Sequence, residues 1–416
     1  MTERPARRPR IIAVADTDSY VKWAAALVAD PWVDGSLIVL DTELVVSDTQ
    51  LTSALSGTGL ATERVRRAAF DELPVRLAGA DGVVIAARGP LTRVVARVAA
   101  GLNPRPVIVT GLPGISLPAT WLALHFRRQC DMFVLHSHRE IAAFRALADE
   151  RGIDQRFALA TLPFARHAAQ TAPTSSGTDL VFAAQALAPR SREDRIRVAR
   201  ILVDAAHADP SRCVVLKLRG RPGEQQTHRE VDAYPDLLAE MDDVPRNLVV
   251  SYAPMHEALA TAEGLVTVSS TAAIEAAAQG VPVIALDTFG IDEKLINVVF
   301  AGSGLLGGAD DVVARRFRHP HQDWLRDNYF HDAADDSWVA LVADLIVRRR
   351  RGDLPGRPAH ARVGGLARDA WERRLALGNR DRSLIGVAAY GAGVPLRAAM
   401  RRWRRVVTRA RGPRSA

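Results

Sequence analysis

Three hydroxyl side chains gather at one junction of the 416-residue sequence, where an apolar run gives way to an alanine-rich stretch. The segment reads LVTVSSTAAIEAAAQGVPVIALD over residues 265–287, and Ser269, Ser270 and Thr271 stand between its two halves. This pattern predicts a strand, a helix and a second strand, with the hydroxyls where the helix begins. One hydroxyl is enough to cap a helix, so the others are candidate donors to a phosphate bound at the helix start.

Basic side chains follow another strand-like run. The sequence VVLKLRGRPGE, residues 214–224, places Lys217, Arg219 and Arg221 at and just beyond the end of the run. Guanidinium groups bind phosphate through two parallel hydrogen bonds and stay charged, and an ammonium group binds it as a point charge. We therefore expect these residues to form the second half of an anion site, opposite the hydroxyls. An ordinary basic loop is the alternative.

Acidic residues and histidines follow apolar runs in the first half of the chain. Asp16 and Asp18 lie in VADTDSYVKW, and His136, His138 and Glu140 lie in FVLHSHREIAAF. Each is a candidate for the base that removes a proton from an attacking hydroxyl. Asp18 fits a helix cap equally well. The two histidines lack further ligands at helical spacing, so we expect no metal site.

The elements that must position these groups follow an alternating pattern. Short apolar runs at residues 10–16, 35–41, 82–87, 105–111 and 132–137 alternate with amphipathic stretches, and the pattern restarts near residue 180. Continuous apolar runs separated by helices indicate parallel strands buried on both faces. The sequence therefore predicts an α/β protein with two Rossmann-like domains facing a cleft. The expected parts are an extension (1–9), an N-terminal domain (10–165), a linker (166–179), a C-terminal domain (180–347) and an arginine-rich tail (348–416).

The net charge of +8 is concentrated in the tail. From Arg348 onward there are 19 arginines, no lysines and four acidic residues, so the remainder of the chain is net negative. That distribution excludes a nucleic-acid-binding body. The two cysteines lack disulfide or metal-ligand spacing, which favours a reducing cytoplasm. No apolar run approaches the roughly 18 residues of a membrane span.

The tail itself combines an apolar run with a basic segment. Residues 383–396 read SLIGVAAYGAGVPL, and RAAMRRWRRVVTRARGPR follows. An apolar stretch beside arginines and a tryptophan is typical of an interfacial anchor on an anionic membrane. We therefore predict a cytoplasmic protein that binds peripherally to the inner face of the membrane. A tail packed on the body of the protein is the alternative.

The serine junction, together with the basic run, resembles a known family. Its strand, SST, helix, glutamate, Gly-x-Pro and strand resemble the C-terminal domain of GT-B glycosyltransferases, most closely the bacterial capsule polysialyltransferase and Kdo-transferase types. The CDP-glycerol glycerophosphotransferases are more distant relatives. The resemblance implies that Ser269, Ser270 and Thr271 contact the donor phosphate and that Glu275 faces the donor sugar or ribose. Those enzymes carry K-x-H-P where this chain has Lys217, Arg219 and Gly220, a change that preserves anion binding.

Three more residues border the expected donor site. His256 begins the helix before the serine strand, and Asp292 and Lys294 follow the strand after it. These positions suit contacts to the donor sugar or nucleoside, although helix capping explains Asp292 equally well.

Together these features predict a glycosyltransferase that needs no metal or other cofactor. The nucleotide-sugar would be a substrate, held by the C-terminal domain. The N-terminal domain would bind a cell-surface polysaccharide or lipid-linked acceptor and supply the base. Three alternatives stay open: a sugar-nucleotide epimerase of the same architecture, a glycerophosphotransferase-like polymer enzyme and a non-catalytic GT-B-like binding protein.

Overall fold

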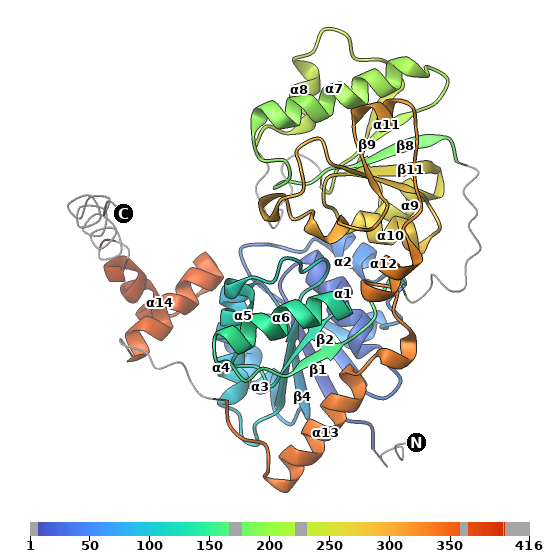
Figure 1. The fold of residues 1–416 in the computed structure, drawn as a ribbon. Helices are drawn as coiled ribbons and strands as arrows, with labels where there is room; N and C mark the ends of the chain where they lie inside the picture. The colour runs from blue at the N-terminus through green and yellow to red at the C-terminus, as the bar shows by residue number, and fades with distance from the viewer. Residues whose placement is uncertain (1–6, 166–176, 221–230, 358–364, 394, 396–416) are drawn as a thin grey trace, which may run out of the picture.

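Two α/β domains stacked on one another make up the protein (Figure 1). The computed structural model describes residues 7–165, 177–220, 231–357, 365–393 and 395. Each domain is built on one parallel sheet with helices packed against it. The predicted fold class, two Rossmann-like domains, is therefore confirmed.

A seven-stranded parallel sheet forms the centre of the N-terminal domain. Its strands are β1 (Arg10–Ala15), β2 (Asp34–Leu40), β3 (Val65–Ala68), β4 (Gly82–Ala86), β5 (Val107–Gly111), β6 (Met132–Leu135) and β7 (Phe157–Leu159). Their order across the sheet is β3-β2-β1-β4-β5-β6-β7. Residues 11–15 of β1 are all buried, because helices cover both faces of a parallel sheet.

Helices cover both faces of this sheet, and alternate residues of a strand pack against opposite helix layers. The helices are α1 (Asp18–Val28), α2 (Asp48–Leu55), α3 (Leu73–Leu77), α4 (Gly89–Ala100), α5 (Trp121–Arg127) and α6 (His138–Glu150). Ile11 and Ala13 pack into the cluster that contains α1, whereas Ile12 and Val14 pack into the cluster that contains α4. This alternation is the two-residue period of a strand, so α1 and α4 lie on opposite faces.

A six-stranded parallel sheet forms the centre of the C-terminal domain. Its strands are β8 (Asp179–Ala183), β9 (Val214–Lys217), β10 (Leu248–Ser251), β11 (Ala262–Thr267), β12 (Val283–Leu286) and β13 (Leu306–Gly307). The order is β10-β9-β8-β11-β12-β13. Its helices are α7 (Arg192–Ala208), α8 (Tyr234–Ala239), α9 (Met255–Ala260), α10 (Ala272–Ala278), α11 (Ala309–Val313) and α12 (Gln322–Asp327).

The chain returns to the N-terminal domain after α12, which corrects the predicted boundary at residue 347. Helix α13 (Trp338–Arg351) crosses that boundary and packs beside β5 and β7. Trp338, Val342, Leu345 and Ile346 belong to the N-terminal core cluster. Their spacing defines an apolar stripe that the sequence shows, but such a stripe does not say which sheet it covers.

The first part of the arginine-rich tail docks on the N-terminal domain. Helix α14 (Gly365–Leu377) packs against α4, and Arg97 of α4 forms ion pairs with Asp369, at 2.7 Å, and with Glu372. Residues 384–393 are helical, and Gly393 lies against Trp371. In the part of the chain that the structure describes, no helix has the length and apolarity needed to cross a bilayer.

Each sheet contains one point where the strand order reverses. In the N-terminal sheet it lies between β1 and β4, and in the C-terminal sheet between β8 and β11. Helices leave the two strands toward opposite faces at such a point, so a crevice forms beyond their carboxyl ends, and ligands of open α/β sheets bind there. We call these two places the β1/β4 crevice and the β8/β11 crevice.

Candidate functional site

Uncharged side chains close the β8/β11 crevice. Gln185 follows β8 and Ser269 follows β11, and Gln185 Oε1 accepts hydrogen bonds from the Ser269 N–H and hydroxyl at 2.9 and 3.0 Å. One layer below, the Thr267 hydroxyl donates to the Ala183 carbonyl at 3.0 Å. Ser269 is almost fully buried. Its hydroxyl therefore holds the crevice together and is not directed to solvent.

The next two hydroxyls have different partners. Ser270 Oγ accepts a hydrogen bond from the Ala272 N–H at 3.2 Å, so Ser270 caps the first turn of α10. Thr271 occupies the N-cap position but makes no capping bond with its side chain. Its Oγ1 faces the N-terminal domain, where a Cβ on Gly114 would lie only 2.8 Å away. Both hydroxyls keep their O–H groups as donors, because neither donates to another group within the described residues.

Lys217 ends β9, which neighbours β8 on the side away from β11, so it lies at the same carboxyl edge as the hydroxyls but across the crevice from them. Lys217 pairs in register with Ala183 of β8, and the Ala183 carbonyl accepts the hydrogen bond from Thr267 of β11. The three residues therefore lie at the same level on the neighbouring strands β9, β8 and β11. Its ammonium group is buried and donates to the Leu218 carbonyl. Burial lowers the pKa of Lys217 to about 8, and the positive charge of Arg219 lowers it further, while the carboxylate of Glu275 opposes the shift. An anionic ligand would restore the charged form of this lysine.

Arg219 reaches the N-terminal domain. Its Nη2 donates to Asp18 Oδ1 at 2.7 Å and also to the Ser19 hydroxyl. A second interdomain pair joins Lys22 Nζ to Glu275 Oε1 at 3.7 Å. The carboxyl edges of the two sheets therefore face each other, and the structure brings together the predicted residues Asp18, Lys217, Arg219 and Glu275. Arg221 lies outside the described residues.

A buried ion pair closes the β1/β4 crevice. Asp16 follows β1 and is fully buried, and its Oδ2 accepts a hydrogen bond from Arg88 Nε at 2.7 Å. Burial raises the pKa of Asp16, and the positive charge of Arg88 opposes that shift. About a third of the Arg88 side chain is exposed (34%). Asp16 therefore holds a guanidinium group at the edge of the sheet and is itself shielded from solvent.

The predicted bases His136 and Glu140 lie in the protein interior. Trp23 Nε1–H donates to His136 Nε2 at 2.8 Å, so His136 Nδ1 carries the proton and donates to the Ala160 carbonyl. Burial lowers the pKa of His136 to about 4 and raises that of Glu140 to about 7. Glu140 accepts hydrogen bonds from the Tyr329 hydroxyl and from the backbone of Ser116. The assignment of both residues as bases is corrected to a packing role, because both side chains are fully buried.

His138 is exposed but points elsewhere. Its Nε2 lies 3.2 Å from Asp335 Oδ2, and its ring lies 5.6 Å from the ring of His331. Both partners belong to the segment that returns to the N-terminal domain, and the three residues line a hollow of about 490 Å³. His138 therefore belongs to the connection between the domains.

The three remaining candidates, His256, Asp292 and Lys294, are exposed residues of the C-terminal domain. His256 is exposed on α9. Asp292 Oδ1 accepts from the Lys294 N–H at 2.6 Å, which makes Asp292 a structural cap, and the Lys294 side chain is exposed. Within the described residues, none of the three forms a hydrogen bond or ion pair with Lys217, Arg219 or the serine junction.

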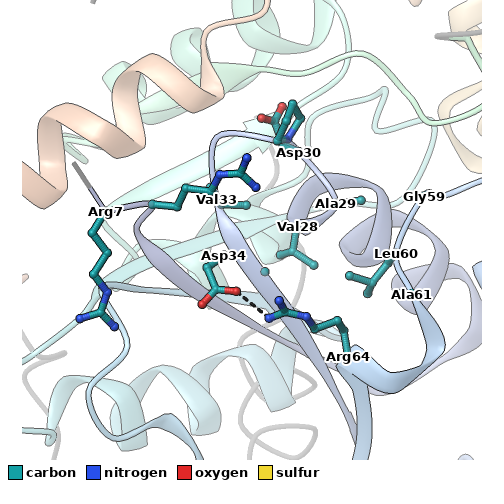
Figure 2. Close-up of a pocket in the computed structure, with 13 residues that line it drawn as sticks. Arg7, Val28, Ala29, Asp30, Val33, Asp34, Gly59, Leu60, Ala61 and Arg64 are labelled. Atoms are coloured by element: carbon teal, nitrogen blue, oxygen red, sulfur yellow. Dashed lines mark hydrogen bonds and ion pairs between the residues drawn. The ribbon is translucent and has the colours of Figure 1, made fainter. Parts of the chain in front are cut away.

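Two hollows in the surface lie away from the two crevices. The one that His138 lines is described above, and a second, of about 480 Å³, lies at the opposite, amino edge of the N-terminal sheet (Figure 2). In it Arg64 pairs with Asp34 at 2.6 Å. As for metals, no cluster of three or more potential ligands occurs in the part of the chain that the structure describes.

Sequence reasoning missed Arg88 and Gln185. Each directly follows an apolar run, in GVVIAAR and LVFAAQ, so each has the same positional signal as the predicted site residues. The missing information was the strand order, because only the reversal of order makes two particular strand ends a crevice.

Two Rossmann-like domains with facing carboxyl edges define a GT-B-like protein. The chain belongs to the family described as "Putative glycosyltransferase (DUF6716)", whose family model matches residues 11–345. No curated protein matches the sequence.

Solved structures share the fold at low sequence identity. UDP-GlcNAc 2-epimerase from Methanocaldococcus jannaschii is 10% identical with a TM-score of 0.53, over 80% of this chain and 99% of that one. S. aureus MnaA, solved with UDP, is 11% identical with a TM-score of 0.52, over 84% of this chain and 99% of that one. A third structure, TcCGT1 in complex with UDP, is 10% identical with a TM-score of 0.47, over 84% of this chain and 94% of that one.

Proposed function

We propose that the protein transfers a sugar from a nucleotide-sugar donor to a cell-surface polysaccharide or a lipid-linked acceptor. One observation carries the proposal: Lys217 and Arg219 lie at the same sheet edge as the Ser270 and Thr271 hydroxyls. Two cations and two hydroxyl donors along one sheet edge suit the diphosphate of a nucleotide-sugar. The glycosyltransferase family and the UDP bound to S. aureus MnaA support this choice of ligand.

In the proposed reaction, Asp18 acts as the base. Its carboxylate takes the proton of the acceptor hydroxyl as the acceptor oxygen bonds to the anomeric carbon. The bond from that carbon to the donor phosphate breaks, and the phosphate leaves with the negative charge. Lys217 and Arg219 stabilise this charge as it develops, so the proposed reaction requires no metal. Asp18 suits this role because it is partly exposed and contacts Arg219 directly.

Donor binding would separate Arg219 from Asp18. Their ion pair is exposed on both sides, and pairs of that kind contribute little to stability. A phosphate that binds Arg219 through two hydrogen bonds would therefore replace Asp18 at small cost and free its carboxylate for the acceptor.

The experiment is a titration of the protein with UDP-, GDP-, CMP- and CDP-linked sugars, followed by an assay of nucleotide release. Binding of at least one donor is expected, together with release that depends on an added acceptor. Activity should persist in EDTA. If none of the donors binds, the proposal is wrong.

An epimerase is the second candidate, because the M. jannaschii structure that shares the fold is named a UDP-GlcNAc 2-epimerase. An epimerase would interconvert the free sugar-nucleotide without an acceptor, and the same assay would detect this. We also propose that the protein is similar to capsule polysialyltransferases and Kdo transferases. This similarity would affect which donor and which acceptor it uses.

We also propose that the tail binds an anionic membrane surface, where a lipid-linked acceptor would be found. Leu384, Ile385 and Val387 are exposed on the helical segment 384–393, and an arginine-rich sequence follows it. Apolar contact and attraction between arginine and acidic lipids reinforce each other. Co-sedimentation with vesicles of phosphatidylglycerol and phosphatidylcholine should exceed that with phosphatidylcholine alone, and should disappear when residues 383–416 are deleted. Equal sedimentation of the deleted chain would refute the anchor.

A further inference from the structure

The β1/β4 crevice contains a charged group that the proposed reaction does not use. Arg88 follows β4, and its Nε donates to the buried carboxylate of Asp16. Within the described residues, this is the one hydrogen bond that its guanidinium group forms. The two Nη groups are therefore left as a pair of parallel donors on a side chain that is one-third exposed.

The fold does not require a charged pair at this place. In the C-terminal domain the equivalent strands are β8 and β11, and uncharged hydrogen bonds join Gln185 and Ser269, which follow them. A buried carboxylate loses several kcal/mol of hydration, so closing the crevice with Asp16 and Arg88 costs more than closing it with an amide and a hydroxyl. A role of Arg88 in binding a ligand therefore explains the ion pair better than a structural role in linking the ends of β1 and β4.

The surroundings of Arg88 favour a negative ligand. Arg88 is the N-cap residue of the 12-residue helix α4, whose N-terminus carries partial positive charge. Lys22 and Arg219, which both make interdomain ion pairs, add positive charge at the carboxyl edges of the two sheets. The carboxylate of Asp18, two residues after Asp16 in the chain, is paired with Arg219, and Asp16 occupies only the Nε side of the guanidinium group.

We propose that Arg88 binds an anionic group of the acceptor, either a carboxylate or a phosphate, through its two Nη groups. Asp16 is the positioning residue that fixes the orientation of the guanidinium group. The inference rests on the proposed function in one respect, namely that the N-terminal domain is the acceptor side. It narrows the acceptor to an acidic sugar or a sugar or lipid phosphate.

The test compares three small probes by saturation-transfer NMR titration. Methyl glucuronide carries a carboxylate, methyl glucoside 6-phosphate carries a phosphate, and methyl glucoside is neutral. The wild-type protein should bind at least one anionic probe about tenfold more tightly than the neutral one. A preference for the glucuronide alone indicates an acidic sugar, and a preference for the phosphate ester alone indicates a phosphorylated acceptor.

Variants locate the preference. Asp16→Asn/Arg88→Met removes both charges, so no buried carboxylate is left unpaired, and it should abolish the preference. The single variant Arg88→Lys, which keeps Asp16 and a positive charge, should retain part of the preference for the anionic probe. Arg64→Met breaks an ion pair at the amino edge and should leave it intact. The proposal is overturned if the wild type shows no preference, if the double variant keeps it, or if Arg64→Met removes it.

Nucleotide titration of the same samples separates this inference from the proposed function. The double variant should bind the nucleotide as the wild type does. If the wild type binds no nucleotide, the proposed function fails, yet the loss of anion preference in the double variant still decides whether Arg88 binds anions.

Discussion

The β8/β11 crevice of the C-terminal domain (the C-terminal crevice) and the β1/β4 crevice of the N-terminal domain (the N-terminal crevice) differ in charge, although the two domains share a topology. Gln185 and Ser269 close the C-terminal crevice without formal charge, and Lys217 and Arg219 supply cations beside it. Asp16 and Arg88 close the N-terminal crevice with an ion pair. The shared fold therefore explains where ligands bind, and the different side chains explain why the donor phosphate and the acceptor would bind at different crevices.

Removing the cation beside the uncharged crevice is the strongest way to break this comparison. Lys217→Met should weaken binding of the nucleotide donor by about 100-fold, because charge-assisted hydrogen bonds to phosphate are lost. The melting temperature should stay equal or rise, since the variant no longer buries an ammonium group. Calorimetric titration measures the first effect, and Arg200→Met, which removes an exposed cation of the same domain, is the control.

A second change makes the C-terminal crevice resemble the N-terminal one. Gln185→Glu keeps the oxygen that accepts from Ser269 but adds a negative charge near the proposed phosphate position. We expect donor binding to weaken by about 30-fold through charge repulsion. Gln50→Glu is a matched control, because Gln50 also accepts a backbone hydrogen bond but lies in an exposed cap of α2. Equal affinities of the two variants would show that the crevice does not contact the phosphate.

The lysine beside the C-terminal crevice should also give donor binding a pH dependence. Burial lowers the pKa of Lys217 to about 8, so the side chain loses its proton as the pH rises from 7 to 9. The affinity for the nucleotide should fall by roughly tenfold over this range. Lys217→Arg should remove the dependence, because arginine stays charged. A wild-type affinity that is constant across the range would argue against a phosphate contact by Lys217.

The smallest expected effect concerns the interior of the N-terminal domain, which lies outside both crevices. Burial raises the pKa of Glu140 to about 7, so the folded state binds the proton more tightly than the unfolded state does. The free energy of unfolding should therefore decrease as the pH rises from about 4.5 to 7. Glu140→Gln should reduce this slope in urea titrations and leave nucleotide binding unchanged. A change in nucleotide affinity would place Glu140 back in the site.

The strands could be predicted from sequence, because parallel strands that are buried on both faces consist of continuous apolar residues, such as residues 11–15. The position of α13 could not, because its apolar stripe fits either sheet. Ser269–Thr271 and Lys217 were found from their places at strand ends. The same rule selected His136, which is buried, since a strand end does not reveal whether the side chain points inward. The contacts of Arg219 with Asp18 and of Gly114 with Thr271 depend on how the domains meet, which no local pattern encodes.

The central claim is that the C-terminal crevice binds the donor phosphate. A crystal structure of the protein with a bound nucleoside diphosphate tests it most directly. The account predicts phosphate oxygens within hydrogen-bonding distance of Lys217 Nζ and of the Ser270 or Thr271 hydroxyl. A diphosphate bound instead at Arg88 in the N-terminal crevice, or beside Arg64 at the amino edge, would contradict it.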